Sequence, residues 1–264
     1  MRPSIITLLT DFGTKDYYVA SMKGVILRIN PQCFLVDITH QISPQDIREG
    51  AFLLAHTFSY FPKQTIHLAI VDPEVGGKRR PILLKTRNYF FVGPDNGLFT
   101  WVGEKDGVDQ VVELTNPEYF LSPISSTFHG RDIFAPVAAY LSLGMRPESF
   151  GKRINQWVTL DWKRPEEKGK RLIGEIILID HFGNLITNVE KKRFFSFIKD
   201  QPFMIKIGKK RISKLSQGYW EGKKGEVIAL FGSTDFLEIA VREGSAQERL
   251  KAERGDPILI ERGQ

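Results

Sequence analysis

The chain has 264 residues, of which 42% are hydrophobic and 26% charged, with a net charge of +6. These values are ordinary for a soluble globular protein, and no apolar run reaches the roughly twenty residues that cross a bilayer. Residues 1–4 lead directly into a strand-like run without the apolar core of a signal peptide. Cys33 is the only cysteine, which excludes a disulfide framework and a cysteine-based metal cluster. We therefore expect a cytoplasmic protein without a membrane partner or a metal site.

The basic character of the chain, with a pI near 9.3, would also suit a nucleic-acid-binding protein. However, acidic residues interrupt or flank the basic clusters, as Glu166 and Glu167 do within 163–171. The sequence contains no recognition helix, zinc finger or aromatic RNA-binding motif. We expect solvated basic surface and no nucleic-acid partner, and RNA binding remains an alternative that only the pI favours.

Strands and helices alternate through the first third of the chain. Apolar runs that end at polar or turn residues predict strands at 4–10, 34–38, 65–71, 81–86 and 89–92. Apolar residues at helical spacing predict helices at 17–29, from 44 to about 60, and at 133–143, with Asp16 as the cap of the first. This order favours a Rossmann-like α/β domain whose parallel sheet is covered on both faces. The strands at 81–86 and 89–92 are expected to form an antiparallel pair.

The composition changes near residue 160, which predicts two domains, 1–160 and 161–264. The charged segment 162–170 contains Pro165 and Gly169 and is expected to be a linker. Short strands follow, separated by turn residues: 172–180, 203–207, 210–215, 227–231, 236–241 and 257–261. Only 191–198 and 246–249 have a helical pattern. This pattern predicts a smaller C-terminal β-barrel, or a sandwich.

Three residue types that can activate water stand near the predicted ends of elements. Asp72 ends an apolar strand, Arg79 follows seven residues later, and His129 stands before a glycine. An Asp, an Arg and a His can together hold, orient and deprotonate a water molecule. The alternative is an ordinary salt bridge at a strand end, and these residues alone do not decide between the two.

Further motifs accompany these residues in a fixed order along the chain. They are Thr10-Asp11-Phe12-Gly13, Gly93-Pro94-Asp95-Asn96-Gly97-Leu98, Phe128-His129-Gly130-Arg131-Asp132, Asp180-His181-Phe182-Gly183-Asn184 and Leu237-Glu238-Ile239-Ala240-Val241. Together they resemble the S-adenosylmethionine hydroxide adenosyltransferases, relatives of fluorinating and chlorinating enzymes that use the same substrate. The resemblance extends from about residue 5 to about residue 260.

The resemblance implies roles for residues of the first domain. Asp72, Arg79 and His129 match the catalytic residues, with His129 as a proton relay. Asp11 would grip the 2′- and 3′-hydroxyls of the ribose, and Phe12 would pack on the sugar; a turn or capping role is the alternative for Asp11. The sequence departs from the family pattern in the loop after Asp72, because Glu74 stands where glycine is common and Gly77 where threonine is common.

The resemblance also implies roles in the second domain. Asp180 and Asn184 would bind the methionine end of the substrate, with Phe182 against the adenine or the sulfur. Alone, the Asp180–Asn184 segment would be interpreted as a tight turn. Ser233, Glu238 and Val241 match the edge that binds adenine. Glu238 interrupts an apolar run, so it either faces solvent or accepts a hydrogen bond from the adenine amino group.

The resemblance implies hydrolysis of S-adenosyl-L-methionine to adenosine and L-methionine by a homotrimer that needs no cofactor. Each site would lie between the first domain of one subunit and the second domain of its neighbour. Two alternatives remain: a halogenase of the same superfamily, and a protein that binds adenosine or S-adenosylmethionine without turnover. A methyltransferase is disfavoured, because Asp11-Phe12-Gly13 stands where a Gly-x-Gly-x-Gly loop would follow the first strand.

Overall fold

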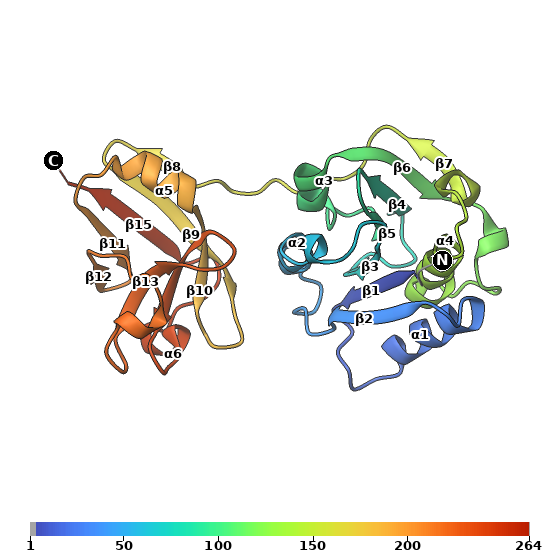
Figure 1. The fold of residues 1–264 in the computed structure, drawn as a ribbon, viewed down its shortest axis with the longest axis horizontal. Coiled ribbons are helices and arrows are strands. Elements are labelled where there is room, and N and C mark those ends of the chain that lie inside the picture. Colours follow the sequence, from blue (N-terminus) through green and yellow to red (C-terminus); the bar gives the residue numbers. More distant parts are fainter. Residues whose placement is uncertain (1–3, 264) are drawn as a thin grey trace. The chain divides into compact units, whose positions relative to one another are not determined.

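The computed structural model describes residues 4–263. Residues 1–3, which belong to the start of the chain where no signal peptide was expected, lie outside the described residues. The chain divides into two compact units between Asp161 and Trp162 (Figure 1). Within the described residues, no helix has the length and apolarity needed to span a membrane. The two units are called the N-terminal and the C-terminal unit.

The N-terminal unit contains a seven-stranded sheet in the order β2-β1-β3-β5-β4-β6-β7. The strands are β1 (Ile5–Thr10), β2 (Phe34–Thr39), β3 (Ile66–Ile70), β4 (Pro81–Thr86), β5 (Phe90–Pro94), β6 (Val108–Leu114) and β7 (Gly151–Ile154). The first four strands in this order, β2, β1, β3 and β5, are parallel to one another. The remaining three strands extend the sheet by antiparallel pairing, and the predicted β4–β5 pair is confirmed. The pattern did not predict β6 and β7, because their polar residues hide the apolar face.

Helices cover both faces of this sheet (Figure 1), as the alternating pattern predicted, although the helix at Thr100–Asp106 was not predicted. They are α1 (Tyr18–Ile29), α2 (Ile47–Ala55), α3 (Thr100–Asp106) and α4 (Ala135–Ser142). Asp46 caps α2 by accepting a hydrogen bond from the Glu49 amide at 2.9 Å, and α2 ends before a separate 3₁₀ turn at Phe58–Tyr60. The predicted Asp16 cap is wrong, because Tyr17 occupies the N-cap of α1 and makes no side-chain cap bond. A π-helical turn, Gly130–Phe134, leads into α4.

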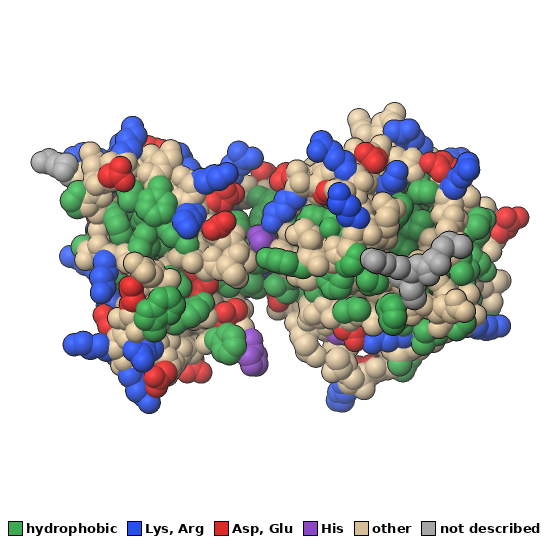
Figure 2. Space-filling model, viewed as in Figure 1, with side chains coloured by type: hydrophobic (Ala, Val, Ile, Leu, Met, Phe, Trp, Pro, Cys, Tyr) green, Lys and Arg blue, Asp and Glu red, His purple; other side chains and the backbone are tan. Residues whose placement is uncertain are grey.

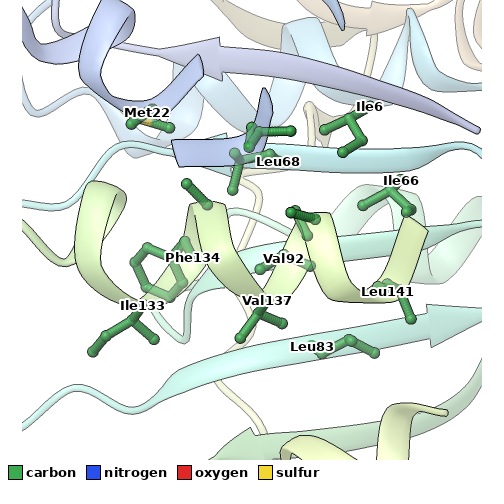
Figure 3. Close-up of a cluster of buried hydrophobic side chains, with 14 of the residues drawn as sticks. Ile6, Met22, Ile66, Leu68, Leu83, Val92, Ile133, Phe134, Val137 and Leu141 are labelled. Atoms are coloured by element: carbon green, nitrogen blue, oxygen red, sulfur yellow. The ribbon is translucent and has the colours of Figure 1, made fainter. Parts of the chain in front are cut away.

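The main core of the N-terminal unit lies between the sheet and α4 together with α1 (Figure 3). Leu68, Val92 and Leu83 contribute from neighbouring strands, and Phe134 and Val137 contribute from the helix. All five side chains are fully buried. The packed apolar layer fixes the strands, so the residues that follow the strand ends are held in place.

The C-terminal unit is a strongly curved, barrel-like sheet (Figure 1) in the order β12-β11-β15-β9-β10-β14-β13, with β8 paired to β9. The strands are β8 (Glu166–Lys168), β9 (Arg171–Ile179), β10 (Leu185–Glu190), β11 (Phe203–Ile207), β12 (Lys210–Ile212), β13 (Val227–Phe231), β14 (Phe236–Val241) and β15 (Pro257–Arg262). The helices α5 (Lys191–Ile198) and α6 (Ala246–Leu250) match the predicted helices closely. Strand β8 lies inside the segment that was predicted to be a linker. Strand β10 was not predicted, because Thr187, Asn188 and Glu190 interrupt its apolar residues.

The basic residues do not gather into one patch on the face shown in Figure 2. Lys and Arg side chains are scattered over both units among Asp and Glu side chains. Several form ion pairs, among them Arg193 with Glu167 and Lys206 with Glu261. This distribution fits the interpretation of the net charge as solvated surface.

Candidate active site

Polar residues follow the carboxyl ends of the parallel strands in the N-terminal unit. His40 follows β2, Asp11 follows β1, Asp95 follows β5, and Asp72 lies two residues beyond β3. These strands are parallel neighbours, so their carboxyl ends meet at one edge of the sheet. In open α/β sheets ligands bind at this edge. The fold therefore gathers residues that are far apart in the sequence into one region.

Asp72, Arg79 and His129 form one continuous hydrogen-bonded chain. Nε of Arg79 lies 2.9 Å from Oδ1 and 3.0 Å from Oδ2 of Asp72, and Nη2 lies 2.5 Å from Oδ2. The same Nη2 donates to Nδ1 of His129 at 2.8 Å. The side chains of Arg79 and Asp72 are only 2% and 4% exposed. Their mutual neutralisation compensates for the cost of burying two charges.

The contact between Arg79 and His129 fixes the tautomer of the imidazole. A guanidinium has no acceptor, so Nδ1 of His129 must accept the hydrogen bond. The proton of the neutral ring is then on Nε2. Burial lowers the pKa of His129 below its ordinary value, and the charge of Arg79 lowers it further, although Asp72 and Asp132 act in the opposite direction. In this arrangement His129 is neutral near pH 7 and offers an N–H donor at Nε2.

The loop between Asp72 and Arg79 is closed by tight backbone contacts. Gly76 has a φ of +74°, and a Cβ atom there would lie 2.0 Å from the carbonyl oxygen of Ser126. Gly77 donates its backbone N–H to the carbonyl of Glu74 at 2.9 Å, and the side chain of Glu74 is exposed. The loop therefore closes through its backbone despite the two departures from the family pattern. The close approach to Ser126 also holds the loop against the segment that leads to His129.

Asp11 and Phe12 lie beside this chain. Oδ2 of Asp11 accepts the backbone N–H of Gln45 at 2.8 Å. Burial raises the pKa of Asp11, hydrogen bonds from the backbone of Gln45 and of Asp11 lower it, and the charge of nearby Asp72 raises it again. Phe12 packs edge-on against Phe128, with 6.1 Å between ring centroids. The structure thus brings Asp11 and Phe12 into the neighbourhood of Asp72 and of the residue before His129.

Arg80, next to Arg79 in the sequence, is also paired with an acidic residue. Its Nε donates to Oδ2 of Asp95 at 2.9 Å, and its Nη2 also donates to the carbonyl of Gln156. Asn96 donates from Nδ2 to the carbonyl of Val71 at 2.8 Å. The Gly93–Leu98 motif therefore braces the end of β3 from the neighbouring strand β5. Arg80 precedes the regular strand β4, so the alternation of side chains along that strand does not describe its direction.

In the C-terminal unit, Asp180 and Asn184 close the turn between β9 and β10. Oδ1 of Asp180 accepts the backbone N–H groups of Phe182 and Asn184 at 2.9 Å each, and Oδ2 accepts Nδ2 of Asn184 at 2.9 Å. The two predicted ligand residues are therefore in direct contact and have a structural role in the turn. Phe182, at the tip of this turn, is 72% exposed. His181 is exposed.

Glu238 is buried, so the alternative that it faces solvent is wrong. It is only 6% exposed, and its Oε1 accepts a hydrogen bond from the hydroxyl of Tyr219 at 2.6 Å. Burial raises the pKa of Glu238, the bond from Tyr219 opposes this, and the charge of Asp180 raises it further. Burial, followed by Glu238, also raises the pKa of Tyr219. No sequence pattern indicated Tyr219, because local periodicity does not relate it to a strand residue nineteen positions later.

The two other predicted residues of this unit occupy different environments. Ser233 is exposed in the turn between β13 and β14, and Val241 is buried at the end of β14. Gly232, beside Ser233, lies against the carboxylate of Glu238. The side chain of Val241 contributes to the core, so only its backbone is available to a ligand.

One surface cavity lies away from the candidate residues, and the described residues contain no cluster suited to a metal ion. Across residues 4–263, no group of three or more His, Cys, Asp or Glu side chains is placed to hold a metal ion. A surface cavity of about 340 Å³ is lined by residues that include Ser4, Gln64 and Arg146, near the opposite ends of the strands. It contains none of the predicted site residues.

Two models of one protein family match the chain, one within each unit. The N-terminal domain model of the SAM hydroxide adenosyltransferases matches residues 6–151, and the C-terminal domain model matches residues 174–259. A structure from Thermotoga maritima, described as an uncharacterized conserved protein, has a TM-score of 0.91 and 38% identity and covers 97% of this chain and 100% of its own. A conserved hypothetical protein from Thermus thermophilus has a TM-score of 0.78 at 34% identity, with 98% and 100% covered.

Curated relatives are similar over nearly the whole chain. A protein of Methanocaldococcus jannaschii named (R)-S-adenosyl-L-methionine hydrolase is 39% identical, over 97% of this chain and 95% of its own length. One of the same name from Thermus thermophilus is 35% identical over 98% and 100%. A fluorinase from Nocardia brasiliensis is 30% identical over 72% of each chain.

Proposed function

Because the chain belongs to the S-adenosylmethionine hydroxide adenosyltransferase family, we propose that it hydrolyses S-adenosyl-L-methionine to adenosine and L-methionine. The observation that carries the proposal is the buried chain Asp72–Arg79–His129 beside Asp11 at the carboxyl edge of the sheet. The carboxylate of Asp72 can accept a proton, and neutral His129 offers an N–H donor. The second carboxylate, that of Asp11, can bind a diol.

The proposed reaction is a displacement at the ribose C5′. The oxygen of water forms a bond to C5′ while the C5′–S bond breaks, and the electron pair of that bond moves to sulfur. The positively charged sulfonium thereby becomes the neutral thioether of L-methionine. The water oxygen loses one proton, and adenosine retains the other hydrogen as its 5′-hydroxyl. Positioning of water, C5′ and sulfur in one line supplies much of the rate.

We assign the proton acceptor to Asp72 and the orientation of water to His129. Both oxygens of Asp72 accept from Arg79, but a carboxylate has about four acceptor positions, so the water can also donate to it. The Nε2–H of His129 can donate to the water oxygen. Protonation of His129 would place a second positive charge against Arg79, which argues against His129 as the first proton acceptor.

The remaining candidate residues would bind the rest of the substrate. Asp11 would accept hydrogen bonds from the ribose hydroxyls, since only Oδ2 is used by Gln45. Asp180 and Asn184 would hold the methionine end, and Phe182 supplies an exposed aromatic surface for the adenine or the sulfur. Ser233, Glu238 and the backbone at Val241 would form the adenine edge. The Tyr219–Glu238 bond supports a fixed position of that carboxylate.

We also propose a metal-independent homotrimer that acts in the cytoplasm, with S-adenosylmethionine as substrate rather than cofactor. The ligand residues are divided between two compact units, which suits sites completed by a neighbouring subunit. The pairing of Asp72 with Arg79 balances its charge without a metal ion and leaves an acceptor position for water. The single, buried Cys33 suits a reducing compartment.

The test is to incubate the protein with S-adenosylmethionine and separate the products by chromatography, with and without a strong chelator and with concentrated chloride or fluoride. We expect adenosine and L-methionine in every arm. A halide beside ionised Asp72 would meet a like charge, and the repulsion between them is roughly 4 kcal/mol at 4 Å and an effective dielectric of 20. Faster formation of 5′-halo-5′-deoxyadenosine would favour the halogenase alternative, and binding without products would favour a non-catalytic protein. Loss of activity with chelator, restored by one metal, would overturn the proposed mechanism.

A further inference from the structure

His40 connects the surface of the N-terminal unit with the turn that carries Asp11. Its side chain is buried, although it follows directly after the edge strand β2. Nδ1 lies 2.8 Å from Oγ1 of Thr10, the last residue of β1. Nε2 lies 3.0 Å from Oδ1 of Asp37, and Asp37 also accepts from Nζ of Lys23 at 2.6 Å. A chain of polar groups therefore extends from Lys23 to Thr10.

The direction of the hydrogen bonds in this chain follows from the chemistry of its ends. Nε2 of His40 does not meet the geometry of a hydrogen bond with Asp37, but the negative charge of that carboxylate 3.0 Å away favours the tautomer with the ring proton on Nε2. In the neutral ring Nδ1 then accepts, and the donor is the hydroxyl of Thr10. The lone pairs of this hydroxyl receive the backbone N–H of Phe12 at 3.2 Å. Thr10 is thus held in one orientation, in which it fixes the backbone just after Asp11.

The backbone of His40 holds the other end of the same turn. Its carbonyl accepts the N–H of Gly13 at 2.7 Å, and Gly13 has a φ of +67°, which favours glycine. The register between β1 and β2 shifts after Leu8, so that Leu9 lies opposite Thr39. This shift brings His40, rather than Thr39, beside Thr10. One residue therefore binds both ends of the Thr10–Gly13 turn.

We propose that His40 is a positioning residue that sets the selectivity of this turn for the ribose diol. Asp11 lies in the middle of the turn, and its carboxylate can accept from two hydroxyls only if the backbone on both sides stays in place. The inference rests on the proposed function, because it presumes that the ligand of Asp11 is a nucleoside. His40 would act through Thr10 and Gly13, without touching the ligand.

The experiment measures selectivity rather than stability. Calorimetry would give the affinities of the whole protein for adenosine and for 2′,3′-dideoxyadenosine, and their ratio reports the ribose contacts. Thr10→Val removes the hydroxyl with little change in shape, His40→Leu removes both ring nitrogens, and His40→Asn retains an acceptor near the place of Nδ1. The matched control is Thr7→Val. Thr7 also lies on β1, and its hydroxyl makes the same kind of buried hydrogen bond, at 2.7 Å, with Nδ1 of His67 on β3.

We expect Thr10→Val and His40→Leu to lower the ratio of adenosine affinity to dideoxyadenosine affinity by about tenfold. This change corresponds to the net contribution of one or two hydrogen bonds. His40→Asn should recover most of it, and Thr7→Val should leave it unchanged even if it lowers the melting temperature. An unchanged ratio in folded Thr10→Val overturns the inference, whether or not His40→Leu folds. An equal loss in Thr7→Val would also overturn it, because the effect would then be general destabilisation.

The two failures can be told apart with the unmodified protein. If it neither binds adenosine nor hydrolyses S-adenosylmethionine, the proposed function fails, and the inference about His40 fails with it. If it does both and discriminates between the two nucleosides, but the variants at Thr10 and His40 discriminate equally well, only the inference about His40 fails.

Discussion

Nη2 of Arg79 donates a hydrogen bond to Nδ1 of His129 across 2.8 Å, which leaves the imidazole proton on Nε2. The same guanidinium holds both oxygens of Asp72. Arg79 therefore determines what its two neighbours can do: Asp72 is an anchored acceptor, and His129 is a donor. This arrangement leads to different expectations for substitutions at the two positions.

His129→Asn should separate the two contacts of the imidazole. The amide oxygen can accept from Arg79 in place of Nδ1, but the donor at the position of Nε2 is lost. We expect turnover to fall by about 10²-fold, with adenosine affinity close to that of the unmodified protein. His129→Leu should reduce turnover further, because it also leaves Arg79 without its acceptor. Unchanged turnover in the Asn variant would remove Nε2 from the mechanism.

Asp72→Asn should lower turnover far more than it weakens substrate binding. The amide cannot take up the proton that water loses, so we expect a fall in kcat of about 10²- to 10⁴-fold. The matched control is Asp95→Asn, which weakens the pair between buried Asp95 and half-buried Arg80 at the same sheet edge. This control should lower the melting temperature while turnover per folded molecule stays within about tenfold. Similar losses of kcat in both variants would contradict the assignment.

The affinity for adenosine should fall when Asp11 becomes protonated. Because the pKa of Asp11 is raised, this fall should begin at a higher pH than for an ordinary Asp. Burial raises the pKa of Asp11, and the charge of Asp72 adds to this. Ionisation of Asp11 therefore opposes folding above its raised pKa, and that cost is relieved as pH falls. Ribose binding responds in the opposite sense, since it needs the ionised form. In Asp72→Asn the fall in affinity should move to lower pH; identical curves by calorimetry would show that the two carboxylates are not coupled.

Gly76→Ala should distort the loop between Asp72 and Arg79. The new Cβ atom would meet the carbonyl of Ser126 in a backbone conformation with positive φ. We expect a loss of about 2–5 kcal/mol in the free energy of unfolding, from strain and overpacking together, and a large fall in turnover. Gly144→Ala is the control: its φ is +91°, but nothing lies within 4 Å of the added atom. It should cost about 1–2 kcal/mol with little effect on turnover.

Light scattering should give a mass about three times the 30.1 kDa of one chain. The physical reason is that the proposed ligand residues are divided between two units, which suits the proposal that a neighbouring subunit completes each site. Dilution should lower specific activity together with the measured mass. A monomer with full activity would refute the trimer.

The sequence was sufficient for the elements whose burial produces a clear period. The buried β1 and β3, the helical pattern of α1 and α5, and the alternating strands of the barrel-like sheet were predicted within a few residues. Strands with mixed polarity were missed, as β6 and β10 show. Their pairing depends on partners distant in the sequence, which local periodicity does not describe.

For the candidate site, the sequence by itself determined the residue types: Asp11, Asp72, Arg79 and His129 all stand at or just beyond the ends of predicted elements. Only the tertiary structure decided their states. Burial and neighbours at the sheet edge of the N-terminal unit set the tautomer of His129 and the raised pKa of Asp11, and packing within the C-terminal unit sets the pairing of Glu238 with Tyr219. The physical reason is that hydrogen bonds and desolvation act over a few ångströms in space, between residues up to fifty positions apart, and that distance is set by the packing of the sheet.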